Sequence, residues 1–459
     1  MMAVDTISTS LRTEECEGAL IGALMVENRL IDQAADIVSP EDFSEPLFGR
    51  IYSLLLRERS LGKAANVITL QPFLRDDPAV IELGGPGFLA NLTGSASLIG
   101  APDFARQIRD LAARRRLVDG LTNAVHLAND LGADAQDIID AADAAIVDAT
   151  IDRDTIHQVT GAQCIDELFA SYEQSSMGTR CTVIPAIDEL LGEMRPKQLV
   201  IGAGRPGMGK TAVALSYALG AAQGGHGTLF VSMEMSSTEL AQRMAADLCF
   251  DGRGGVAFNA IRDNRLSHGD RLQMARVREM LADMPFHVID AGHMTIGRLG
   301  MIVRRYKRRL AARGESLDLV VVDYLQLISP DRNMRSAYEA VSEVSRGLKA
   351  IAKDNDVAVF ALAQLSRSVE QRADKRPILS DLRDSGQIEQ DADAVLFLYR
   401  HEYYLKQSEP DQGTAEHASW QGMLDDCRGA IDFILAKRRN GITGTAQGRF
   451  HGAFQAVRG

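Results

Sequence analysis

The second half of the chain alternates short apolar runs with helix-like stretches. From about residue 181 onwards, the apolar runs lie at 199–203, 228–232, 286–289, 317–323, 357–363, 394–399 and 431–436. Runs of this length, separated by stretches with helical periodicity, are typical of strands that are buried on both faces of a parallel sheet. We therefore predict an α/β domain over residues 181–459, in which helices cover a mostly parallel sheet.

The first half has a different pattern, in which apolar residues recur at intervals of three and four. Leu20 and Leu24 form one such pair, and Leu47 and Ile51 form another. This spacing places apolar side chains on one face of a helix. We predict an all-α domain over residues 12–151.

The residues between these halves, 152–180, are more polar and contain one amphipathic segment at 162–173. Ile165, Leu168 and Phe169 lie on one side of that segment if it is helical. A helix this short is marginal alone in water, because its nucleation cost is not recovered. We therefore expect a linker whose helix docks on its own domain or on a neighbouring copy.

The composition is that of a globular protein, and the charge restricts how it could contact nucleic acid. The 459 residues are 46% hydrophobic, and the net charge is −12. A protein that coats nucleic acid by bulk electrostatics is expected to be basic, so any contact here must be local. Five scattered cysteines argue against a zinc site or a disulfide framework. No apolar run approaches the ~20 residues of a membrane span, so we expect a cytoplasmic protein without membrane contact.

The strongest chemical signal directly follows the run at 199–203. It reads Gly204-Arg205-Pro206-Gly207-Met208-Gly209-Lys210-Thr211 and continues through Ala212 into a helix-like stretch. Glycines, a lysine and a hydroxyl at this spacing, between a strand and a helix, are the pattern of a phosphate-binding loop. Lys210 can reach the β and γ phosphates of a triphosphate, and Thr211 can offer its hydroxyl to Mg²⁺. We expect these residues to bind ATP and Mg²⁺ rather than to form a chance glycine-rich turn.

Two carboxylates are expected near this loop, at the carboxyl edge of the sheet. Asp323 ends the run at 317–323, and an acid at this position in a phosphate-loop enzyme holds Mg²⁺ through its water shell. The alternative is an acid that merely caps the segment after the strand. Glu234 follows the run at 228–232 and could orient an attacking water, or it could be an exposed structural glutamate.

Three further polar residues follow later strands. Gln364 comes after 357–363 and could hydrogen-bond a γ-phosphate, although amides are common at strand ends. Lys437 and Arg439 follow 431–436 in a probable turn. In an isolated subunit they would be solvated charges. In a ring, a strand-end arginine can reach the nucleotide of the neighbour and act as an arginine finger.

Three segments are candidates for contact with nucleic acid. Residues 376–393 form a polar stretch between two strands, in which backbone N–H groups and Arg383 could grip a phosphodiester chain. The many acids around Arg383 weaken its attraction for DNA. Residues 304–309 and 114–116 are more basic, but a solvated helix face or an ion pair between helices explains them better.

Together these motifs resemble those of the bacterial replicative DNA helicase family of the DnaB type, in a chromosomal or phage-derived version. The resemblance runs nearly end to end and is less strict in the helical half, where it includes residues 39–43 and 84–87. Its motifs in the second half are Gly204 to Thr211, Ser232-Met233-Glu234-Met235, Asp323-Tyr324-Leu325-Gln326-Leu327, Ala363-Gln364-Leu365-Ser366-Arg367, residues 381–393 and Ala436-Lys437-Arg438-Arg439-Asn440-Gly441.

The resemblance implies a RecA-like motor domain, an N-terminal helical collar and a linker helix that packs on the adjacent subunit of a hexameric ring. It implies ATP-driven movement from 5′ to 3′ along single-stranded DNA, with the complementary strand excluded. It also implies a primase and a helicase loader as partners.

Residue roles follow from the same resemblance. Glu234 would be the hydrolytic base, and Lys210 and Thr211 would bind the phosphates and Mg²⁺. Asp323 would hold the metal through water, and Gln364 would sense the γ-phosphate.

Two further groups of residues receive roles in the same way. Arg439, helped by Lys437, would be the finger that reaches the next subunit. Arg383, Asp384 and Gly386 would hold the DNA backbone, largely through main-chain groups, which an acidic protein tolerates.

The chain departs from the family pattern at two places, and two other functions remain open. Residues 182–188 replace the usual Thr-Gly-Phe entry to the motor domain, and Gly207 stands where serine is usual. The alternatives are a recombinase-like filament ATPase, which the long helical half disfavours, and a regulatory scaffold. The scaffold is disfavoured by the complete set of Glu234, Asp323 and Arg439, since a scaffold needs binding more than turnover.

Overall fold

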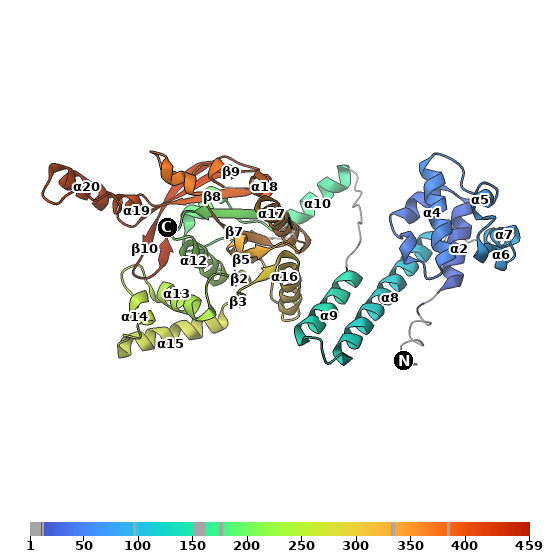
Figure 1. Cartoon of the computed structure of the whole chain (residues 1–459), viewed down its shortest axis with the longest axis horizontal. Helices are drawn as coiled ribbons and strands as arrows, with labels where there is room; N and C mark the ends of the chain where they lie inside the picture. The colour runs from blue at the N-terminus through green and yellow to red at the C-terminus, as the bar shows by residue number, and fades with distance from the viewer. Residues whose placement is uncertain are drawn as a thin grey trace. The chain divides into compact units, whose positions relative to one another are not determined.

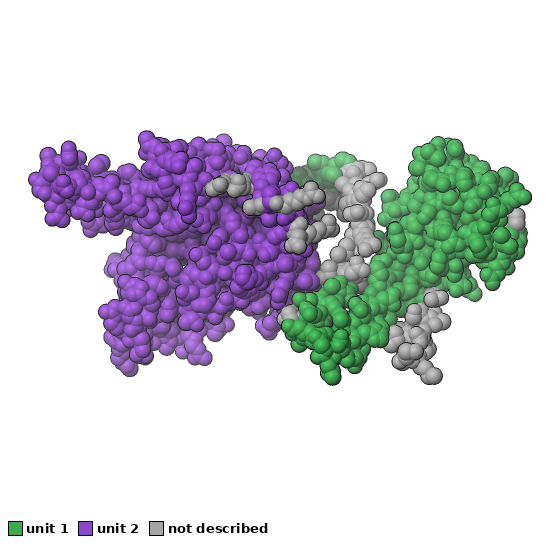
Figure 2. All heavy atoms as spheres, viewed as in Figure 1, with its two compact units in different colours: residues 1–169 green, residues 170–459 purple. Residues whose placement is uncertain are grey.

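The computed structural model describes residues 11, 13–94, 98, 100–150, 161–173, 178–331, 334, 336–382 and 386–459. The chain divides into two compact units, residues 1–169 and residues 170–459 (Figure 2). Residue 12 and the parts of the predicted linker at 152–160 and 174–177 lie outside the described residues. Every helix in the described part of the chain is too short or too polar to cross a bilayer.

All regular elements in the described residues of the first unit are helices, as the periodicity predicts. Leu20, Leu24, Leu47 and Ile51, which carried that prediction, are all buried in one core. The elements are α2 (Glu14–Val26), α3 (Arg29–Ala35), η1 (Pro40–Asp42), α4 (Pro46–Ser60), α5 (Val67–Leu74), α6 (Pro78–Glu82), α7 (Pro86–Gly94), α8 (Ala101–Asn129) and α9 (Ala135–Thr150), followed by α10 (Gly161–Glu173) in the linker.

The basic triplet at 114–116 lies on α8 and makes ion pairs within the first unit. Arg116 Nη1 lies 2.7 Å from Asp42 Oδ1, and Arg114 Nε lies 2.8 Å from Asp110 Oδ2 one turn earlier on the same helix. Asp42 is buried at the end of η1, so Arg116 ties α8 to that turn. The ion-pair interpretation of this triplet is therefore confirmed.

The linker segment forms a helix, α10, over almost the residues predicted for it. Ile165 is half exposed on this helix. The division between the two compact units falls within α10, after residue 169.

The second unit is built on a mostly parallel sheet, which confirms the predicted fold class. Nine strands of the described chain form it, in the order β11-β10-β9-β8-β1-β7-β5-β2-β3. The strands from β8 to β3 in this order are parallel to their neighbours, and β9 to β11 are antiparallel. Their bounds are β1 (Leu199–Gly204), β2 (Thr228–Ser232), β3 (Phe286–Asp290), β5 (Leu319–Asp323), β7 (Ala358–Gln364), β8 (Ala394–Tyr399), β9 (Ala430–Arg438), β10 (Gly444–His451) and β11 (Ala456–Arg458).

Helices cover both faces of this sheet (Figure 1). One apolar core joins the sheet to α12 (Lys210–Gln223) and α13 (Ser237–Cys249), and the other joins it to α16 (Ile296–Ala311) and α17 (Ala337–Asp354). The remaining elements of the unit are α11 (Pro185–Leu191), α14 (Phe258–Arg262), α15 (His268–Asp283), β4 (Met294–Thr295), η2 (Leu325–Leu327), β6 (Ile328–Ser329), η3 (Arg367–Gln371), η4 (Leu379–Asp381), α18 (Gly386–Asp391), α19 (His401–Leu405) and α20 (Ala415–Asp426). Central strands enclosed in this way explain the continuous apolar runs in the sequence.

Candidate active site

The glycine-rich segment forms the turn between β1 and α12, at the middle of the sheet. β1 pairs with β7 on one side and β8 on the other, and Lys210 is the first residue of α12. Gly207 and Gly209 have φ angles of 81° and 85°. Because residues with a side chain rarely adopt this left-handed conformation, the turn depends on glycine at both positions.

A cavity of about 430 Å³ lies over this turn and brings together most of the predicted nucleotide-binding and catalytic residues. Lys210 and Thr211 enter it from the start of α12, Glu234 from the segment after β2, and Gln364 from the end of β7. The complete lining is Pro206, Gly207, Gly209, Lys210, Thr211, Ala212, Glu234, Arg243, Tyr324, Gln364, Arg400, Phe450 and Gln455.

Asp323 ends β5, the strand between β7 and β2, and is 1% exposed. Among the described residues, neither of its carboxylate oxygens has a hydrogen-bond partner. Burial raises the pKa of Asp323 to about 6, while the Thr211 hydroxyl and the cations of Lys210 and Arg243 oppose the rise. A buried carboxylate with two open oxygens, beside a hydroxyl, fits a hydrated divalent cation, because leaving it unpaired is costly.

In the described part of the chain, Lys210 is one of three cations that line the cavity, with Arg243 and Arg400. Burial lowers the pKa of its ammonium, and the carboxylates of Asp323 and Glu234 oppose that shift. A cation in a partly dehydrated site interacts strongly with an added anion. The cavity therefore offers a phosphate a positive charge at the point where the α12 backbone N–H groups also begin.

Gln364 ends β7 opposite Gly204, the last residue of β1, in the parallel register. Gln326 holds its backbone from both sides, because the Gln364 N–H donates to Gln326 Oε1 at 3.2 Å and Gln326 Nε2 donates to the Gln364 carbonyl at 3.3 Å. The main chain at Gln364 is thus fixed, and its side chain lines the cavity.

Three predicted ATP-binding residues lie outside the cavity lining. Gly204 belongs to β1, and Met208 is buried in the core on the α12 face of the sheet. The Arg205 guanidinium points away from the cavity and donates to Glu370 Oε1 at 2.8 Å and to the carbonyl of Leu365 at 2.9 Å. These three residues therefore support the turn without lining the cavity.

The sequence interpretation missed several residues of the cavity, of which Arg243, Arg400 and Phe450 are the most suggestive. Arg400 Nη1 donates to the Gly207 carbonyl at 3.3 Å, and its Cζ atom lies 4.3 Å from the centre of the Phe450 ring. Arg243 is on α13, where burial lowers its pKa and the charge of Asp323 opposes the shift. An arginine directly after the predicted strand at 394–399 was a usable signal for Arg400.

Lys437 and Arg439 lie at the end of β9 and in the turn after it, as predicted. Lys437 Nζ donates to the carbonyls of Glu389 and Ala392, the latter at 2.8 Å. Arg439 Nη1 lies 3.5 Å from Asp393 Oδ1, and its side chain is 61% exposed. Within one chain both residues therefore contact the segment around α18 rather than the nucleotide cavity.

The residues predicted to hold DNA are only partly described. Arg383 and Asp384 lie outside the described residues, and Gly386 is the first residue of α18. In its described residues, the polar stretch at 376–393 contains two short helical elements, η4 and α18. The basic segment at 304–309 lies on α16, where Lys307 donates to the Asn355 carbonyl.

Comparison with protein families assigns both units. The DnaB-like helicase C terminal domain matches residues 181–458, and the DnaB-like helicase N terminal domain matches residues 10–110. The chain is 34% identical to the replicative DNA helicase DnaB of Rickettsia prowazekii, over 94% of this chain and 90% of that protein. It is 31% identical to that of Geobacillus stearothermophilus, over 94% and 91%.

Solved structures agree with this assignment. A DnaB-like replicative helicase, described with its interactions with primase, matches 97% of this chain and 99% of its own with a TM-score of 0.71 and 25% identity. The ATPase domain of G40P matches 66% of this chain and 99% of its own, with a TM-score of 0.55 and 28% identity. The chain therefore belongs to the DnaB family of replicative DNA helicases, which are ATP-dependent enzymes that unwind DNA.

Proposed function

We propose that this chain assembles into a hexameric ring that hydrolyses ATP with Mg²⁺, moves from 5′ to 3′ along single-stranded DNA and unwinds the duplex at the replication fork. The observation that carries the proposal is the cavity over the phosphate loop. It joins Lys210, Thr211, Glu234 and Gln364 at the carboxyl edge of one sheet, with Asp323 buried at the same edge.

In this cavity the backbone N–H groups at the start of α12 and the Lys210 ammonium bind the β and γ phosphates. Thr211 and Asp323 hold Mg²⁺, Asp323 through water. Bound Mg²⁺ would neutralise charge that develops on the phosphate oxygens. Glu234 orients the attacking water, and Gln364 hydrogen-bonds the γ-phosphate. Positioning and charge compensation account for most of the catalysis, because phosphoryl transfer has a loose transition state.

The cavity also has a surface suited to a base. Phe450 and the Arg400 guanidinium form a stacked pair at its wall. Flat apolar and cationic groups of this kind stack on nucleobases. We assign this side of the cavity to the adenine ring.

Arg439 completes the active site of the adjacent subunit. Its guanidinium is mostly exposed and lies outside the cavity lining of its own chain, as a group that acts on a neighbour must be. Lys437 supports it by holding the end of β9 against α18. The proposal therefore requires a ring or another head-to-tail assembly, in which each interface contains one nucleotide.

Arg383, Asp384 and Gly386 hold the DNA backbone within this ring, largely through main-chain groups. Residues 12–151 form the helical collar, 152–180 the linker with its docking helix, and 181–459 the motor domain. We further propose that the ring works in the cytoplasm and binds a primase and a helicase loader. The structural relative that was described with primase supports the first of these partners.

A forked DNA substrate tests the central claim. With ATP and Mg²⁺, the protein should unwind a fork with a 5′ single-stranded tail and leave a fork with only a 3′ tail intact. Lys210→Ala should abolish both unwinding and DNA-stimulated ATP hydrolysis, because the phosphates lose their principal cation. Equal unwinding of the two forks would refute the proposed direction, and unwinding by Lys210→Ala would refute the assigned site.

A further inference from the structure

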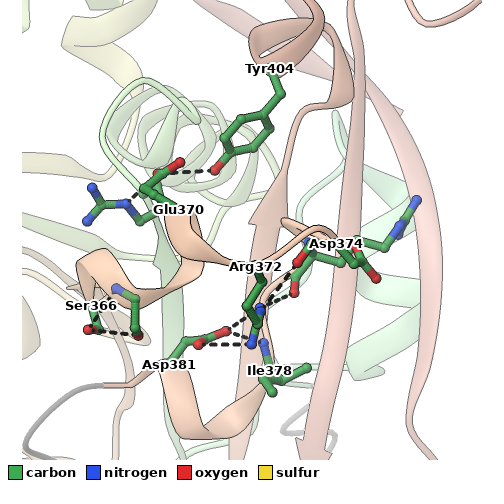
Figure 3. Close-up of polar contacts among 10 residues, drawn as sticks. Ser366, Glu370, Arg372, Asp374, Ile378, Asp381 and Tyr404 are labelled. Atoms are coloured by element: carbon green, nitrogen blue, oxygen red, sulfur yellow. Dashed lines mark hydrogen bonds and ion pairs between the residues drawn. The ribbon is translucent and has the colours of Figure 1, made fainter.

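The side chain of Arg205 connects the phosphate loop to the segment that follows β7. Its Nε donates to Glu370 Oε1 at 2.8 Å and its Nη1 donates to the Leu365 carbonyl at 2.9 Å, and the side chain is only 13% exposed. Tyr404 of α19 donates its hydroxyl to the same Glu370 oxygen at 3.3 Å (Figure 3). Arg205 therefore lies within the phosphate-loop motif but contacts the chain directly after Gln364.

The segment after Gln364 is closed on itself. The N–H of Ser366 donates to the carbonyl of Asp381 at 2.9 Å, so residues 15 apart in sequence meet at the base of a loop. Asp381 also accepts the Ile378 N–H on Oδ2 at 2.8 Å. Leu382 follows Asp381 directly, so this hydrogen bond provides a short path from Gln364 to the residues assigned to DNA.

A second arginine makes the closed loop rigid. Arg372 donates to both carboxylate oxygens of Asp381, at 3.1 and 2.9 Å, and to the carbonyls of Asp374 and Arg376, at 3.3 and 2.6 Å (Figure 3). The Asp381 side chain is 4% exposed. A bidentate contact between an arginine and a carboxylate fixes the orientation of both side chains and also pairs their charges. Residues 366–381 therefore form a single body, which Arg205 and Glu370 attach to the phosphate loop.

We propose that Glu370 is a positioning residue that couples the nucleotide cavity to DNA binding. It makes residues 366–381 move together with the phosphate loop through Arg205. The proposal rests on the proposed function, because it takes the residues after Leu382 to be the DNA-binding ones. Glu370 is 37% exposed, and Arg205 keeps its hydrogen bond to the Leu365 carbonyl without it, so we expect Glu370→Ala to leave the fold intact. Loss of the Arg205–Glu370 pair should instead uncouple the movement of residues 366–381 from that of the phosphate loop.

The prediction concerns a ratio of affinities, which needs no hydrolysis. For the wild type, the dissociation constant of a fluorescent oligo-dT is measured by anisotropy with a non-hydrolysable ATP analogue and with ADP. Coupling between two sites usually changes an affinity by about 5- to 150-fold. We therefore expect the dissociation constants for DNA measured with the ATP analogue and with ADP to differ by a ratio in this range. In Glu370→Ala the ratio should fall to below about twofold, while affinity for a fluorescent ATP analogue should stay within about twofold of the wild type.

Two variants serve as controls. Tyr404→Phe removes only the hydroxyl that contacts Glu370 and should keep the wild-type ratio. Glu370→Gln keeps an oxygen that can accept from Arg205 and should give an intermediate ratio. If Glu370 had a purely structural role, its replacement would instead lower nucleotide affinity. A loss of nucleotide affinity that parallels the loss of the DNA-affinity ratio would overturn the proposal.

The outcomes separate this inference from the proposed function. A wild-type protein that unwinds the 5′-tailed fork, together with a Glu370→Ala variant that keeps its full ratio, would overturn the inference alone. A wild-type protein that neither binds oligo-dT nor unwinds the fork would overturn both. Loss of the ratio in Glu370→Ala, with the ratio retained in Tyr404→Phe, supports the coupling.

Discussion

Replacing Gly207 with serine should impair nucleotide binding in this chain. Gly207 has a φ of 81°, and a Cβ atom added there would lie 2.5 Å from Cε2 and 3.0 Å from Cζ of Tyr403. Ordinary carbon contacts are at about 3.5–4.0 Å. The substitution therefore imposes both backbone strain and a steric conflict with α19.

The two costs can be sized separately. A non-glycine residue in a disfavoured conformation costs about 1–3 kcal/mol. Overpacking of an already filled site costs typically about 1–3 kcal/mol more, since the Tyr403 ring must move. If only about 2 kcal/mol of this sum opposes the binding-competent loop, affinity for ATP falls roughly 30-fold.

A double-mutant cycle distinguishes the steric part from the strain. The affinities of Gly207→Ser, Tyr403→Ala and the double variant are measured with a fluorescent ATP analogue, and their melting temperatures are measured in parallel. Because the shortened side chain at 403 leaves room for Cβ, the double variant should recover the steric share, about 5-fold or more in affinity. Wild-type affinity in Gly207→Ser, or no recovery in the double variant, would refute this reasoning.

Three further substitutions probe the site and its support. Arg439→Ala should keep ATP binding and lose hydrolysis in the assembled ring. Full ATP turnover in this variant would refute the proposal that adjacent subunits share the active site. Asp323→Asn should require more Mg²⁺ for half-maximal hydrolysis, and an unchanged Mg²⁺ titration would contradict its role. Arg458→Met should cost about 3–5 kcal/mol of unfolding free energy in urea, because it leaves the buried carboxylate of Asp247 without its 2.9 Å ion pair. Burial raises the pKa of Asp247 in the folded state, and loss of the Arg458 cation should raise it further. The deficit should therefore shrink as the pH falls from the pKa of Asp247 in the variant towards that in the wild type, because Asp247 is neutralised first in the variant; a pH-independent deficit would contradict this reasoning.

The sequence predicted those parts of the motor unit that depend on local pattern. Strands such as β1 and β5 are buried on both faces, so their residues form continuous apolar runs. The phosphate loop could be recognised because glycine, lysine and threonine are required there by backbone conformation and charge. Each of these features leaves a signal within a few consecutive residues.

Two strands of the antiparallel edge, β10 and β11, were not predicted, although the run at 431–436 predicted β9, and Phe450 was missed with β10. β10 carries Thr445, Gln447 and Arg449 among its exposed or half-exposed positions, so it lacks an apolar run. Its pairing with β9 is set by contacts across the hairpin rather than by its own composition. Arg243 was missed for a related reason, since an arginine on an amphipathic helix has the same local pattern whether it faces solvent or a cavity.

The same limit applies to the chain around the proposed DNA-binding residues, where the important partners are distant in sequence. Upstream, Leu382 follows the loop that Arg372 closes and that Glu370 attaches to the phosphate loop. Downstream, the N–H of Arg439 donates to the Asp393 carbonyl at 2.8 Å, and Lys437 donates to carbonyls at the end of α18. One side of the segment is thus attached to the chain's own nucleotide cavity. The other side is attached to β9, which leads to Arg439, the proposed finger for the nucleotide of the next subunit. If DNA binds this segment as proposed, its displacement would act on both nucleotide sites.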